Sequence, residues 1–129
     1  MSTSYFQFHQ TLLQNLYRFT DQTLDASHRT EEDQELMAQL KLLCDSDVID
    51  EDFIATGQRA LCKIVAAYPH IAPQTPRDLF WLFGGDCLHY MPDEEIAKYQ
   101  SLDELRFDAE QNNTDFDYEG ERGKAFGLH

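Results

Sequence analysis

Long hydrophobic runs are absent from this chain of 129 residues. No window approaches the roughly 18 consecutive apolar residues that a membrane-spanning helix needs. The opening residues, MSTSYFQ, also lack the basic region and apolar stretch of a secretory signal peptide. We therefore expect a protein without a membrane span and without a signal peptide.

Basic residues are scarce. Ten Lys and Arg stand against 24 Asp and Glu, which gives a formal net charge of −14. A surface of this sign repels phosphate backbones and anionic lipid headgroups, so direct binding to nucleic acid or to a membrane is not expected. The same charge favours a basic partner or a cation, and it can also serve solubility alone.

Cysteine is too sparse and too widely spaced for a disulfide framework or a structural zinc site. The chain has three cysteines, Cys44, Cys62 and Cys87, and no CxxC or CxxH pair. An odd number of separated cysteines is typical of reduced thiols in the cytoplasm. We expect a cytoplasmic protein that needs no cofactor.

Short motifs that mark common enzymes are missing as well. The sequence contains no phosphate-binding glycine loop, no GxSxG elbow, no HExxH and no nucleotide fingerprint. It also lacks a helix-turn-helix with a basic recognition helix. These absences disfavour an enzyme without deciding the question.

Apolar residues at helical spacing are what the sequence does contain, and no segment alternates as a half-buried strand would. The pattern predicts an all-α fold in a single compact domain of five to six helices, orthogonal or bundle-like, over residues 1–113. Residues 114–129 are predicted to be an irregular acidic tail whose apolar residues, Leu128 among them, would let it dock on the domain. The expected helices are 5–24, 31–44, 51–68, 76–91, 92–100 and 101–111.

The segment 76–91 is apolar around most of the helical circumference, which predicts the central helix of the domain. Thr75 is placed to cap it, with Pro76 at the first helical position. Gly57 and Gly84 fall on apolar faces, where a glycine indicates a close helix crossing. Either glycine could instead mark the contact of a homodimer.

Acidic residues gather in two places. Five of the eight residues 45–52 are acids, and residues 103–121 add eight acids against one arginine. Such clusters are consistent with loop and cap chemistry, or with electrostatic docking of a basic partner. Residues 115–121 resemble the first half of an EF-hand loop, but the twelfth position of such a loop would be Phe126, so the bidentate glutamate is missing. The interaction candidates are Asp45, Asp47, Asp50, Glu51, Asp52, Asp115, Phe116, Asp117, Tyr118 and Phe126.

A pocket beside segment 76–91 is the competing prediction. Asp86 and His89 are three residues apart, so they are neighbours on a helix, and His9 lies on the apolar face of the first helix. Together with Trp81 they could line a site that binds a ligand or metal or that catalyses a reaction. They could equally be a buried histidine and a solvent-facing strip.

These observations predict a small acidic helical protein that interacts with or regulates a basic, nucleic-acid-binding protein. The alternative is a ligand- or metal-binding helical protein, or an enzyme, with the pocket just described. Convergence of His9 with Asp86 and His89 in one cavity would favour the alternative.

Overall fold

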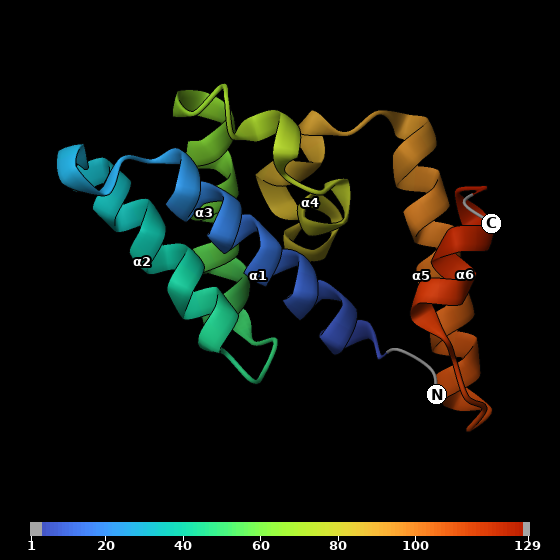
Figure 1. Ribbon diagram of the computed structural model, residues 1–129. Coiled ribbons are helices and arrows are strands. Elements are labelled where there is room, and N and C mark those ends of the chain that lie inside the picture. The colour runs from blue at the N-terminus through green and yellow to red at the C-terminus, as the bar shows by residue number, and fades with distance from the viewer. Residues whose placement is uncertain (1–3, 128–129) are drawn as a thin grey trace. The chain divides into compact units, whose positions relative to one another are not determined.

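The computed structural model describes residues 4–127 (Figure 1). These residues form α-helices and short 3-10 helices and contain no β-strand, which confirms the predicted all-helical class. The described residues group into two compact units, residues 9–90 and residues 4–8 with 91–127. Residues 1–3 and 128–129, including Leu128 of the predicted tail, lie outside the described part of the chain.

The first helices begin and end close to the predicted residues. Thr30 and Asp33 form a reciprocal capping box at the start of α2, and the Asp50 carboxylate accepts the Phe53 backbone N–H at 2.8 Å at the start of α3. Such caps satisfy N–H groups that have no partner within the helix. The helices are α1 (Tyr5–Thr23), α2 (Glu31–Asp45) and α3 (Glu51–Ala67), with the 3-10 helix η1 (Ala26–His28) before α2.

Helix α3 is the central helix of the unit His9–Tyr90. It packs against α2, α4 (Arg77–Phe83) and the 3-10 helix η3 (Gly85–Tyr90). Ala60, Leu61 and Ile64 on its buried face are completely shielded from solvent. The sequence predicted that role for segment 76–91, which instead forms two shorter elements, α4 and η3, that pack on α3.

The predicted helix 76–91 is wrong in its second half, because α4 ends at Phe83. Gly84 and Gly85 take φ values of +65° and +58°, which an α-helix cannot continue through and which glycine adopts readily. Pro76 occupies the cap position, while the Thr75 hydroxyl donates to the Ile71 carbonyl at 3.3 Å at the end of η2 (Ala72–Gln74). Thr75 therefore does not cap α4.

Gly57 marks a close helix crossing, as predicted. A Cβ at this position would overlap the ring of Phe83 on α4. Gly84 is not a crossing point, because its role is to end α4. Gly57 is also buried beneath Phe83, so it offers no surface for a second copy of the chain.

The second unit contains α5 (Asp93–Gln111) and α6 (Tyr118–Ala125), which lie side by side (Figure 1). The predicted helices 92–100 and 101–111 are one continuous helix, and the predicted irregular tail contains α6. Tyr118 is 1% exposed and packs on Tyr5 and Phe8, at ring-centroid distances of 5.0 and 5.2 Å. Burial of this ring accounts for an ordered helix in a polar segment.

A hydrogen bond between α2 and the end of α3 provides a pH-dependent test of the fold. The Tyr68 hydroxyl donates to Asp33 Oδ1 at 2.6 Å, and this bond is the main reason that the pKa of Asp33 lies below its ordinary value of 3.8. Because the folded pKa is depressed, the stabilisation is complete above the unfolded pKa and is lost as the pH falls through the folded pKa. We expect Tyr68→Phe to lower the free energy of unfolding by about 1 kcal/mol at neutral pH.

Urea unfolding followed by fluorescence of the single tryptophan, Trp81, measures the difference in free energy of unfolding between the wild-type chain and Tyr68→Phe. This difference should shrink once the pH falls below the folded pKa of Asp33, since a neutral carboxyl group accepts a weaker hydrogen bond. A difference that stays constant through the acid range would contradict this account of Asp33.

Candidate functional site

Five carboxylates surround the turn between α2 and α3, and we call this group the acidic corner. Helix α2 ends at Asp45, and α3 begins after Asp50, so the loop 46–50 brings the group together. The N-terminal turn of α3 favours carboxylates electrostatically, which accounts for part of the cluster. All five are exposed. They are Asp45, Asp47, Asp50, Glu51 and Asp52.

Most of this charge is not neutralised. Lys41 forms an ion pair with Asp45 at 3.3 Å, and both side chains are 60% exposed. An exposed pair of this kind contributes little to stability. Within residues 4–127 the other four carboxylates form no ion pair. The acidic corner therefore keeps a strong negative field on the surface.

Two exposed apolar side chains adjoin the acidic corner. Leu42 is 63% exposed and Val48 is 51% exposed. Neither residue is among the interaction candidates predicted from the sequence. Leu42 lies outside the buried stripe of α2, and this position on the helix could have indicated from the sequence that its side chain is exposed. The buried stripe consists of Leu36, Met37, Leu40 and Leu43.

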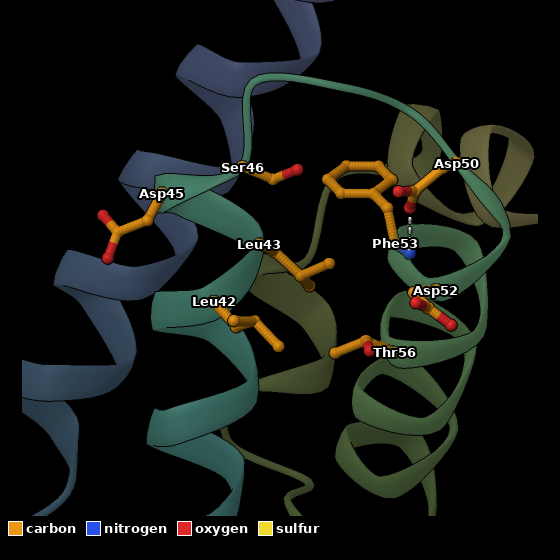
Figure 2. Close-up of a pocket in the computed structure, with 8 residues that line it drawn as sticks. All are labelled: Leu42, Leu43, Asp45, Ser46, Asp50, Asp52, Phe53 and Thr56. Carbon is orange, nitrogen blue, oxygen red and sulfur yellow. Dashed lines mark hydrogen bonds between the residues drawn. The ribbon is translucent and has the colours of Figure 1, made fainter.

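A groove of about 320 Å³ separates the end of α2 from the start of α3. Figure 2 shows Leu42 and Leu43 facing Thr56 across it, with the Phe53 ring near Ser46 at the loop end. The lining also includes Asp45, Asp50 and Asp52. In the same view the Asp45 carboxylate points away from the groove, whereas Asp50 and Asp52 lie on its α3 side.

The second group of interaction candidates is less available to a partner. Tyr118 is buried, so it cannot act as the exposed aromatic contact that the sequence suggested. Phe116 and Phe126 are half-buried, and the ring of Phe126 packs on that of Tyr99 with 4.8 Å between their centroids. The carboxylates of Asp115 and Asp117 are exposed, with Asp117 in the cap position of α6.

The pocket candidates do not gather in one enclosed site. His9 is 2% exposed on α1, whereas the side chains of His89 and Asp86 are 80% and 90% exposed on η3 and lie 3.9 Å apart. Trp81 is half-buried on α4. In the described part of the chain, no three His, Cys, Asp or Glu side chains are arranged to hold a metal ion.

Asp78 of α4 is only 3% exposed, unlike Asp86 and His89 of η3. The solvent-facing strip is thus confined to η3.

The thiols differ in environment. Cys87 is buried on η3 beside Cys62 of α3, and burial, followed by this neighbour, raises the pKa of Cys87 to about 12. Cys44 is half-buried, and burial also raises the pKa of its thiol. Since the thiolate is the reactive form, Cys87 is an unreactive core residue.

We expect iodoacetamide to modify Cys87 in the folded protein on the order of a hundredfold more slowly than in the unfolded chain at the same pH. Mass spectrometry of the labelled peptides measures both rates. Cys44, which keeps partial access to solvent, is the internal comparison. Equal rates for Cys87 in the folded and unfolded chain would contradict its assignment to the core.

The fold and the acidic corner define a class of small, acidic, all-helical proteins with a charged surface groove. The chain belongs to the PA2817-like family, whose model matches residues 1–128. No curated protein and no solved structure gave a significant match. No helix among residues 4–127 has both the length and the apolarity needed to cross a membrane.

Proposed function

We propose that this protein is an interaction or regulatory protein that binds a basic protein partner through the acidic corner. The proposal is carried by two features of one surface: four carboxylates that form no ion pair within residues 4–127, and the exposed side chains of Leu42 and Val48. Charged and apolar side chains at one place supply the long-range attraction and the short-range contact energy that a docking surface uses.

The carboxylates act at long range. A negative patch accelerates encounter with a basic surface and orients it, and its effect falls with ionic strength. Leu42 and Val48 act at short range, where a few apolar anchors supply most of the binding energy. The partner class that fits this surface is a nucleic-acid-binding protein, because its basic face carries the complementary charge. Occupying that face would modulate its activity.

The acidic corner supports this proposal better than the C-terminal segment does. The segment 103–121 carries many acids, but two of them are paired locally: Asp103 lies 3.6 Å from Arg106 and Glu121 lies 3.3 Å from Lys124. Tyr118, one of the aromatic contacts predicted there, is buried within its own unit, whereas Phe107 on α5 is exposed. We also propose the cytoplasm as the compartment, since three free thiols are typical of a reducing environment.

Affinity capture with two matched variants tests the proposal. The corner variant Asp45→Asn/Asp47→Asn/Asp52→Asn removes three charges and keeps the Asp50 cap of α3. The control variant Glu104→Gln/Asp108→Asn/Glu110→Gln removes three charges from exposed positions of α5. Both have the same net charge, so they separate the position of the charge from its amount.

From a nuclease-treated lysate, we expect the wild-type and control chains to retain the same basic protein at low salt. High salt should release it, and the corner variant should retain little of it. Equal capture by the corner variant and the control would overturn the proposal. Loss of all capture after nuclease treatment would also overturn it, because the link would then be the nucleic acid.

A further inference from the structure

The groove between α2 and α3 has an apolar interior and an acidic edge. Leu42, Leu43 and the Phe53 ring provide the apolar surface, with Leu42 accessible to solvent. Among the described residues, no Lys, Arg or His lines the groove. A ligand that enters it therefore meets hydrocarbon along its walls and negative charge on the α3 side (Figure 2).

The carboxylates at the edge retain capacity to bind a cation. Asp50 uses Oδ1 to cap α3, and its Oδ2 forms no hydrogen bond within residues 4–127. Asp52 is exposed in the first turn of α3 and has no ion pair in the described part of the chain. Asp50 and Asp52 both line the groove, and they lie on its α3 side.

The apolar walls and the acidic edge together determine which kind of side chain fits the groove. A wholly apolar side chain would leave the carboxylates unused, and a small inorganic cation would leave the apolar walls unused. A long side chain with a hydrocarbon stem and a cationic head uses both. Arginine fits better than lysine, because its guanidinium is planar, binds carboxylates in a bidentate manner and stacks on aromatic faces.

We propose that the groove between α2 and α3 binds an arginine side chain of the basic partner, with the stem along Leu42 and the guanidinium at Asp50 and Asp52. The volume of about 320 Å³ accommodates one such side chain with part of its backbone. The inference rests on the proposed function, because it names the chemistry by which the acidic corner recognises its partner.

Three soluble peptides test the groove directly. They share one sequence of glycine and leucine with two variable positions, which hold arginine, lysine or citrulline. Citrulline has the shape of arginine without its charge. Titration of the isotopically labelled full chain, followed by amide chemical shifts, reports both affinity and location.

We expect the arginine peptide to shift the amides of Leu42, Leu43, Phe53 and Thr56 most strongly. The lysine peptide should bind several-fold more weakly, and the citrulline peptide about tenfold more weakly or worse. Shifts concentrated outside residues 42–56, or equal binding of the arginine and citrulline peptides, would overturn the proposal.

A pair of leucine variants tests the apolar wall. Leu42→Ala should lower the affinity for the arginine peptide by about three- to tenfold, as expected for an exposed anchor. Leu105 on α5 is 50% exposed, so Leu105→Ala is the matched control and should leave affinity unchanged. Both positions are exposed, and neither variant should unfold the chain. Equal effects of the two variants would contradict a role for Leu42.

These experiments distinguish failure of the groove proposal from failure of the proposed function. If the corner variant loses the captured partner while the arginine peptide leaves residues 42–56 unshifted, docking at the acidic corner stands and the groove proposal fails. If the peptide binds in the groove but no basic protein is captured, the proposed function fails and an arginine-binding groove remains.

Discussion

Phe83→Ala is expected to lower the free energy of unfolding by about 3–5 kcal/mol, as removal of a fully packed phenylalanine does. Phe83 is 2% exposed at the end of α4, and its ring packs on Phe53 with 5.3 Å between centroids. It also covers Gly57 of the central helix α3. Its loss leaves a cavity where α3 and α4 cross. Urea unfolding monitored by Trp81 fluorescence measures the change.

A double variant shows whether the crossing itself causes this loss. Gly57→Ala gains about 1 kcal/mol in helix propensity, but overpacking against the Phe83 ring costs roughly 1–3 kcal/mol. We expect Gly57→Ala to destabilise the wild-type chain and to stabilise Phe83→Ala, where the space is empty. The same sign in both backgrounds would contradict the close contact between Gly57 and Phe83.

Tyr118→Ala is expected to cost about 2–4 kcal/mol of local stability and to release α6. The buried ring contacts Tyr5 and Phe8, all within one unit, and no other residue of α6 is buried. Hydrogen exchange of the α6 amides measures the effect, which should exceed tenfold. Phe107 on α5 is 54% exposed, so Phe107→Ala should change exchange little. Unchanged protection of α6 in Tyr118→Ala would show that other contacts hold the helix.

The sequence predicted the helices whose ends are marked by local chemistry. The Asp50 cap and the acids at residues 31–33 lie where α3 and α2 begin. Periodicity could not show that Gly84 and Gly85 take positive φ and end α4, because both fall within an apolar pattern. Ser101 and Glu104 have the spacing of a capping box and favoured a helix start at residue 101, but both lie inside α5, where neighbouring turns already satisfy the backbone.

The candidate site was only partly predictable. The acids of the acidic corner were visible as a cluster, since they are adjacent in sequence. The groove was not, because Leu42 and Thr56 come from different helices and meet only through packing. Burial of Tyr118 was equally hidden, since its partners Tyr5 and Phe8 lie at the other end of the chain.

The most direct test of docking at the acidic corner is the salt dependence of affinity for the captured partner. Calorimetry would compare the wild-type chain, the corner variant and the equally charged α5 variant. We predict that the wild-type and α5 chains bind alike at low salt, that the corner variant binds about tenfold more weakly or worse, and that the difference narrows as salt screens the charges. An equal loss of affinity in the two variants would contradict docking at the acidic corner, because the net charge of the chain would then determine binding.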